Sequence, residues 1–312
     1  MNSPVDRKIP RQVLMALVLI FLVSAAGLVS LKSVVEAQSE EIHRERSQYS
    51  EIIVTEQDGR RCMRFDVRRH GNLNQSCYLL NDPDRLVFDY TQMSFAGLLV
   101  NPQPERILVA GLGGGSIPTV MNELFPQAHI DVVELDPAVI RVAEEYFGFE
   151  SNGNIHAHAA DARVFIKRAG LRGERYDYVV LDAFGGEYIP EHLMTREFLQ
   201  EVKQVMSDDA VLVANTFSSS ELYDHESVTY RDVFGTFFNF RRAGTGNRII
   251  VATSGPLPSR GDLRQPARDL HERLADYGVT LLEYPSRMST RTDWNTEARV
   301  LTDQYSPVNL LD

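Results

Sequence analysis

Three carboxylates follow three apolar runs in the middle of the chain. Glu134 comes after IDVV, Asp161 follows IHAHAA, and Asp182 ends YDYVVLD. Short apolar runs that alternate with helical patterns are typical of parallel strands, whose carboxyl ends meet at one edge of a sheet. We therefore expect the three acids to lie together, where their oxygens accept hydrogen bonds from the hydroxyl and amino groups of a ligand.

A cluster of glycines precedes the first acid in the stretch ILVAGLGGGSIP, residues 107–118. Glycines between a strand and a helix let a ligand approach the backbone at the carboxyl edge of a sheet. A phosphate-binding P-loop is excluded because no Gly-Lys-Ser/Thr follows, and the third glycine of a dinucleotide motif would fall on Ser116. We expect the loop to hold the tail of a ligand through Gly111, Gly113, Gly114 and Gly115.

The acids and this loop together describe a pocket for a nucleoside. Glu134 lies at a strand end, where an acidic side chain accepts both hydroxyls of a ribose. Asp161, followed by the small residue Ala162, suits an adenine amino group. Asp136, just before Pro137, is more simply interpreted as the N-cap of a helix.

The elements that position these residues follow from periodicity. From Arg106 onward the pattern predicts an α/β fold with a parallel sheet and right-handed crossovers, preceded by a small β-meander. A hairpin around Gly244-Thr245-Gly246 is expected to close the edge of the sheet. We expect strands at 106–111, 129–136, 155–160, 176–182 and 210–217, and helices at 138–149 and 196–206. The predicted domains are a β-meander at 51–95, an α/β domain at 96–258 and an extension at 259–312.

The N-terminus predicts a membrane segment. Residues 13–31 carry no charge over a length that spans a bilayer core as a helix. Basic residues within 1–12 place that end in the cytoplasm and the bulk of the chain on the periplasmic side of the inner membrane. A cleaved signal peptide is the alternative. Residues 32–50 are polar and are expected to form a linker or helical stalk.

Net charge, the histidines and the cysteines limit which ligands and partners the chain is expected to bind. A net charge of −11 argues against nucleic acid. His156 and His158 share a strand face, but no third ligand is identifiable, so we predict no metal site. Cys62 and Cys77 flank a turn and either form a disulfide across a hairpin, which would fit an oxidising compartment, or are two buried residues that never meet.

The ordered segments GLGGGS, VVELDP, ADAR and YDYVVLDAF resemble the spermidine synthases, or polyamine aminopropyltransferases. The resemblance implies a Rossmann-like, doubly wound, mostly parallel sheet of the class I methyltransferase type, which binds S-adenosyl compounds and follows a small β-domain. The resemblance implies that decarboxylated S-adenosylmethionine and a polyamine are the substrates, without a metal, and a homo-oligomer is an open alternative. It implies nucleoside contacts from Gln75 and places Tyr90 beside the amine. By the same resemblance Glu134 holds the ribose, Asp161 and Ala162 the adenine, the glycine loop the tail, and Asp182 the amine.

Two departures from the family pattern leave alternatives open. The acid of the family's GGGDG loop falls on Gly114, and the second acid of its DSSDP signature falls on Gly185; Glu187 or Asp89 would be the substitutes. Aminopropyl transfer is our first functional prediction. Methyl transfer from S-adenosylmethionine is the second, because GLGGGSIP, VVELDP and EEYFGF are similar to methyltransferase domains that modify translation elongation factor. A membrane-anchored protein that binds a ligand or partner without catalysis is the third.

Overall fold

The computed structural model describes residues 39–66, 74–184 and 189–306. The chain separates into two units, Met1–Glu40 and Glu41–Asp312, and all but the first two described residues belong to the second unit. Among the described residues, no helix is both long enough and apolar enough to span a membrane. The predicted anchor at 13–31 lies outside these residues, as do the predicted substitute Glu187 and the family position Gly185.

A four-stranded antiparallel sheet begins the described structure, in the order β1-β2-β3-β4. Its strands are β1 (Glu40–Arg46), β2 (Glu51–Gln57), β3 (Arg60–Asp66) and β4 (Asn74–Leu79). Asp58 and Gly59 join β2 to β3 with positive φ angles of 51° and 73°, as a tight hairpin turn requires. Our prediction of a linker over 32–50 was wrong for β1, whose charged sequence EEIHRER hides the alternation that marks a strand.

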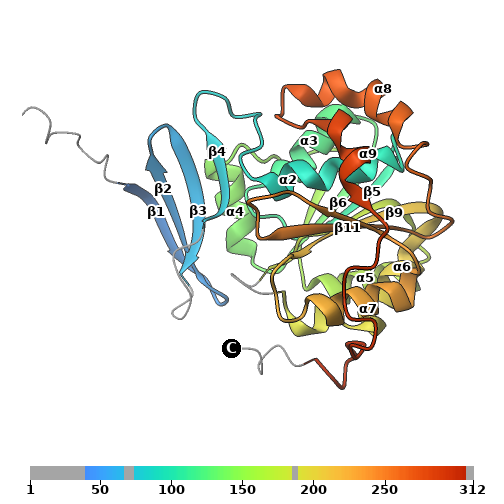
Figure 1. Cartoon of the computed structure of the whole chain (residues 1–312). Coiled ribbons are helices and arrows are strands. Elements are labelled where there is room, and N and C mark those ends of the chain that lie inside the picture. Colours follow the sequence, from blue (N-terminus) through green and yellow to red (C-terminus); the bar gives the residue numbers. More distant parts are fainter. Residues whose placement is uncertain (1–38, 67–73, 185–188, 307–312) are drawn as a thin grey trace, which may run out of the picture. The chain divides into compact units, whose positions relative to one another are not determined.

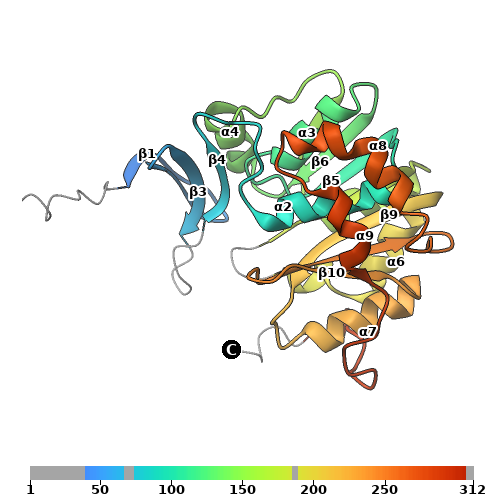
Figure 2. The same cartoon turned by 45° about the horizontal axis from the view of Figure 1, so that its top comes forward.

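One face of this small sheet packs against helix α4 (Pro137–Tyr146). Ile52, Val54 and Met63 are fully buried there against the apolar side of α4. Figures 1 and 2 show the sheet beside α4, so that β4 faces the rest of the protein. The contact is made by β2 and β3, and β4 is held beside them by its ladder with β3.

The main sheet has eight strands in the order β12-β10-β11-β9-β8-β5-β6-β7. The five strands that we expected to be parallel are parallel, and the hairpin β10–β11 is antiparallel. The expected hairpin does not close the edge, because the short β12 pairs with β10 beyond it. The strands are β5 (Arg106–Ala110), β6 (His129–Glu134), β7 (Ile155–Ala159), β8 (Tyr176–Leu181), β9 (Met206–Phe217), β10 (Phe238–Arg241), β11 (Asn247–Thr253) and β12 (Met288–Ser289).

Helices cover both faces of the main sheet, each over its own apolar core. Figure 1 shows α5 (Ala162–Leu171), α6 (Arg196–Val205) and α7 (Tyr223–Phe234) on one face, with α3 (Ser116–Leu124) and α8 (Arg264–Ala275) on the other. This is the predicted Rossmann-like, methyltransferase-type α/β fold, whose ligand site lies at the carboxyl ends of the strands. The remaining short helices are α2 (Asp89–Ser94), η1 (Phe95–Leu99), η2 (Glu191–Leu193), η3 (Leu281–Glu283) and α9 (Tyr284–Arg287).

Helix α2 packs with the main sheet, although we expected the first domain to extend to residue 95. It contacts β9 and β11 of the main sheet, and the Tyr178 hydroxyl donates a hydrogen bond to the Ser94 carbonyl at 3.0 Å. Met93 and Phe95 are fully buried in the core of that sheet. Residues 89–99 therefore pack with the α/β domain, and Tyr90 is presented by it.

Candidate active site

A cleft with a volume of about 130 Å³ lies at the carboxyl edge of the main sheet. Residues from β4, α2, the glycine loop, and the ends of β6 and β8 line it, together with the start of α5 and η2. The predicted site residues that reach this cleft are Gln75, Tyr90, Gly111, Gly113, Glu134, Asp161, Ala162 and Asp182. Gly114 and Gly115 are not among its lining residues, so the structure brings together most of the predicted set but not all of it.

The glycine loop is bare chiefly because the protein packs against it. A side-chain carbon at Gly111 would lie 2.2 Å from the carbonyl oxygen of Asp182, and one at Gly115 would lie 2.6 Å from the Phe149 ring. At Gly114 it would lie 2.5 Å from the Ser76 hydroxyl oxygen. Of the four glycines in the loop, only Gly113 lines the cleft and also has room for a side-chain carbon, whose nearest neighbour would lie 3.8 Å away. The φ angle of Gly113 is 54°. Packing thus gives Gly111, Gly114 and Gly115 a structural reason to lack a side chain, and ligand binding by the four glycines stays a prediction.

Glu134 ends β6 at the rim of the cleft, half-buried. Its two carboxylate oxygens accept backbone N–H groups, one from Leu112 at 3.1 Å and the other from Asp136 at 3.0 Å. Burial raises the pKa of Glu134, and these two hydrogen bonds oppose the rise by favouring the charged form. Each oxygen keeps a second lone pair, so the arrangement leaves acceptors suited to a ribose. Asp136 caps α4 as predicted, accepting the Ala138 N–H at 2.9 Å.

Asp161 is the N-cap of α5 and accepts the Val164 N–H at 2.9 Å. Its other carboxylate oxygen lies 2.8 Å from Nε2 of His192, a residue in η2 that also lines the cleft. Ala162 follows as the first residue of α5 and is buried. Sequence reasoning missed His192, because no motif connects it to a strand end and only the fold brings η2 to this rim.

Asp182 follows β8 and lines the cleft, half-buried. Its Oδ1 accepts a hydrogen bond from Nδ2 of Asn215 at 2.8 Å, and Asn215 Oδ1 accepts one from Asn247 at 3.0 Å. Removal from bulk water raises the pKa of Asp182 to about 7, and the bond from Asn215 opposes that rise. A carboxyl group with such a pKa exchanges protons near neutral pH, as general acid–base catalysis requires. Neither asparagine was predicted from the sequence.

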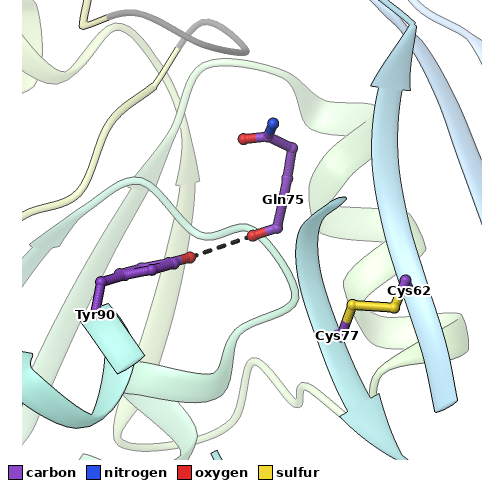
Figure 3. The surroundings of a disulfide bond; sticks show 4 residues. All are labelled: Cys62, Gln75, Cys77 and Tyr90. Carbon is purple, nitrogen blue, oxygen red and sulfur yellow. Dashed lines mark hydrogen bonds between the residues drawn. A yellow bond between two sulfur atoms is a disulfide. The ribbon is translucent and has the colours of Figure 1, made fainter. Parts of the chain in front are cut away.

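Tyr90 projects from α2 toward β4, where its hydroxyl donates a hydrogen bond to the backbone carbonyl of Gln75 at 3.2 Å (Figure 3). Burial, with the charge of Asp182, raises the pKa of Tyr90 well above its usual range. The hydroxyl therefore stays protonated at neutral pH. The predicted pair Gln75 and Tyr90 thus meets across the boundary between the two sheets.

The other predicted candidates lie outside this constellation. Asp89 is exposed and forms an ion pair with Arg242 at 2.9 Å, so it is already neutralised. His158 donates to or accepts from Asp131 at 2.7 Å on β6, and Asp131 also accepts the Tyr176 hydroxyl. No group of three or more potential metal ligands occurs among the described residues.

The two cysteines are bonded to each other. Cys62 on β3 and Cys77 on β4 lie directly opposite in the antiparallel ladder and form a disulfide (Figure 3). The alternative in which the two thiols never meet is therefore excluded. The bond lies two residues from Gln75 along β4.

The fold and the cleft define a methyltransferase-type α/β protein with an N-terminal antiparallel sheet and an acidic site at its strand ends. Comparison with known proteins identifies the family. Residues 88–242 match the spermine/spermidine synthase domain. The chain is 51% identical to a polyamine aminopropyltransferase of Vibrio vulnificus over 276 residues, 88% of this chain and 92% of that protein. The chain belongs to the polyamine aminopropyltransferase (spermine/spermidine synthase) family, a family of transferases.

Two further similarities bear on fold and chemistry. A probable spermidine synthase from Corynebacterium glutamicum superposes with a TM-score of 0.62 at 19% identity, covering 83% of this chain and 98% of that one, which concerns the fold alone. A mouse eEF1A lysine and N-terminal methyltransferase is 34% identical over 190 residues, 56% of this chain but only 27% of that protein. The predicted resemblance to spermidine synthases is confirmed.

Proposed function

We propose that the protein transfers an aminopropyl group from decarboxylated S-adenosylmethionine to an amine of a polyamine at the cleft lined by Asp182. The observation that carries this proposal is Asp182 itself, a carboxyl group in the cleft with a pKa near 7 beside the protonated Tyr90. An amine attacks only after its ammonium form has lost a proton, so the reaction needs a base of this kind.

In the proposed complex, the adenosine lies along the strand ends. Glu134 accepts the ribose hydroxyls, while Asp161 with Ala162 borders the adenine. The sulfonium tail runs past Gly113, which lines the cleft and has open space beside its α-carbon. Gln75 and Tyr90 close the cleft from β4 and α2. Fixing the two reactants in this way accounts for up to roughly 7–11 kcal/mol of a barrier in well-oriented reactions.

The transfer step balances without a further reactant. The acceptor ammonium gives a proton to Asp182, and Oδ2 receives it because Oδ1 already accepts the Asn215 amide. The nitrogen lone pair forms a bond to the methylene carbon attached to the sulfonium. The carbon–sulfur electron pair stays on sulfur, which leaves as the neutral thioether of methylthioadenosine. The new secondary ammonium departs, and Asp182 releases its proton to solvent.

Methyl transfer from S-adenosylmethionine is the second candidate. It is favoured by the similarity to the eEF1A methyltransferase and by Gly114, where the spermidine synthase pattern has an acid. The same cleft would then present the methyl carbon of the sulfonium to the acceptor instead of the methylene carbon. The two candidates differ in which cosubstrate is bound tightly.

Binding measurements on the full chain test these assignments. We expect decarboxylated S-adenosylmethionine to bind more tightly than S-adenosylmethionine, and methylthioadenosine to be released when putrescine is added. We expect Glu134→Ala to weaken methylthioadenosine binding at least tenfold, about 1.4 kcal/mol, in a calorimetric titration. Preferential binding of S-adenosylmethionine with release of S-adenosylhomocysteine would favour methyl transfer, and unchanged binding by Glu134→Ala would remove the ribose assignment.

We also propose that residues 13–31 anchor the chain in the inner membrane with the catalytic region on the periplasmic side. The basic residues of 1–12 before the apolar segment support this orientation. The disulfide between Cys62 and Cys77 supports it as well, since such bonds persist in oxidising compartments.

A further inference from the structure

Gln75 lies at an irregularity in the ladder between β3 and β4. Met63 pairs with Ser76 and Arg64 pairs with Asn74, so Gln75 is the one extra residue on β4 between these two pairs. An extra residue of this kind is a β-bulge, which leaves the ladder locally unpaired and re-aims a side chain, often beside an active site. The bulge explains how the neighbours Gln75 and Ser76 both line the cleft, although successive side chains of a regular strand point to opposite faces.

A bulge disrupts the ladder locally, and an edge strand has a ladder partner on one side alone. β4 is an edge strand, because its one partner in the four-stranded sheet is β3. A slip of one residue turns every side chain of a strand to the other face, and in β4 it would move Gln75 out of the cleft. Something must therefore fix the register beside the bulge.

The disulfide lies where it can fix the register of β4 beside the bulge. Cys62 and Cys77 form the ladder pair adjacent to Met63 and Ser76, and so the covalent bond lies next to the bulge, on the side toward the Arg60–Leu79 end of the ladder (Figure 3). A slipped register would separate the two sulfur atoms. At the bulge itself, the Tyr90 hydroxyl on α2 donates a hydrogen bond to the Gln75 carbonyl.

The same register places Ser76 against the glycine loop. The Ser76 side chain fills the space next to Gly114, where an added carbon would approach its hydroxyl oxygen to 2.5 Å, and it lies 3.8 Å from an added carbon at Gly113. Movement of β4 would therefore alter both the wall of the cleft that carries Gln75 and the loop that holds the sulfonium tail.

We propose that the Cys62–Cys77 disulfide positions the nucleoside-binding wall of the cleft by locking the register of β4 beside the Gln75 bulge. Reduction of the bond loosens Gln75 and Ser76 and weakens nucleoside binding, whereas the base at Asp182, on a different sheet, is left in place. The enzyme then binds its nucleoside tightly only when the disulfide is formed. This inference rests on the proposed function, because it assumes that the nucleoside occupies this cleft.

A double-mutant cycle on the full chain tests the proposal. The four proteins are the oxidised wild type, Cys62→Ser/Cys77→Ser, Gln75→Ala, and the triple variant. We expect loss of the disulfide to raise the Kd for methylthioadenosine at least fivefold, and to lower kcat at saturating substrates by a smaller factor. In the Gln75→Ala background the same loss should raise Kd by a smaller factor than in the wild type, because effects that act through one residue are not additive.

Reduction of the folded wild-type chain, checked by circular dichroism, is a second route to the same state should the serine variants fail to fold, and reoxidation should restore the original Kd. An unchanged Kd after reduction would overturn the proposal, as would an equal effect of disulfide loss in both Gln75 backgrounds. Failure of the oxidised wild type to bind methylthioadenosine would instead reject the proposed function and this inference with it.

Discussion

At the scale of single residues, the chemistry depends on how Asp182 is held. Proximity to bulk water alone would keep its pKa near 3.8, where it would be a weak base for an ammonium group. Desolvation raises that pKa to about 7, and the Asn215 amide limits the rise by donating to the charged form. Asn247 in turn fixes the orientation of Asn215, since its own amide donates to the Asn215 oxygen.

The pH dependence of kcat/KM follows from this arrangement. Because Asp182 acts as a base only when ionised, we expect kcat/KM to rise with pH through about 7. Asn215→Leu removes a hydrogen bond that favours ionisation, so the acid limb should move to higher pH. A hydrogen bond to a charged group contributes about 1.5–3 kcal/mol, so kcat/KM should fall roughly tenfold or more at pH 6 and by about threefold at most at pH 9.

Asn247→Ala is the matched control for this measurement. It removes the partner of the Asn215 oxygen but keeps the amide that contacts Asp182, so its acid limb should move in the same direction as that of Asn215→Leu and by a smaller amount. A limb that does not move in Asn215→Leu, or that moves to lower pH, would contradict the assigned role of Asn215.

At the scale of elements, β4 packs against the glycine loop at the position where the family has an acidic residue. The spermidine synthase pattern has an acid at the position of Gly114, but here the space beside this residue is filled by the Ser76 hydroxyl and the Phe147 ring. Phe147 follows α4 and Ser76 lies on β4, so two elements that are distant in sequence close the same gap. This packing of the small sheet against the main domain thus leaves no room for an acidic side chain at Gly114.

Restoring the family acid should therefore destabilise the protein. We expect Gly114→Asp to lower the free energy of unfolding by about 1–3 kcal/mol, the usual cost of overpacking, in a urea titration. Adding Ser76→Gly should recover part of this loss, because it removes the nearest atom. Ser76→Gly alone provides the reference, and equal stabilities of Gly114→Asp with and without it would show that Ser76 is not the obstacle.

At the scale of the whole molecule, the site depends on both sheets of the second unit. The main sheet supplies Glu134, Asp161 and Asp182, whereas the four-stranded sheet supplies Gln75 and Ser76. The smaller sheet also contains the disulfide, and such a bond persists in an oxidising compartment. A periplasmic site would need a supply of a nucleoside made in the cytoplasm, and so the side of the membrane bears directly on function.

Protease accessibility determines that side. If residues 13–31 anchor the chain with its bulk outside the cytoplasm, protease added to cells with a permeabilised outer membrane should degrade residues 51–312, and a cytoplasmic marker should survive. Thiol alkylation in the same cells should leave Cys62 and Cys77 unmodified until a reductant is added. Degradation only after lysis, together with alkylated cysteines, would place the domain in the cytoplasm.

The sequence by itself determined the parallel α/β core and the meeting of Glu134, Asp161 and Asp182, because strand periodicity and the rule that ligands bind at strand carboxyl ends are local and topological facts. Only the tertiary structure decided what those residues touch. The glycine loop has little room for side chains because Ser76, Phe149 and the Asp182 backbone pack against it. The strand β1 has no apolar alternation by which the sequence could predict it. His192, Asn215 and the bulge at Gln75 likewise depend on contacts between distant segments, which no spacing along one chain encodes.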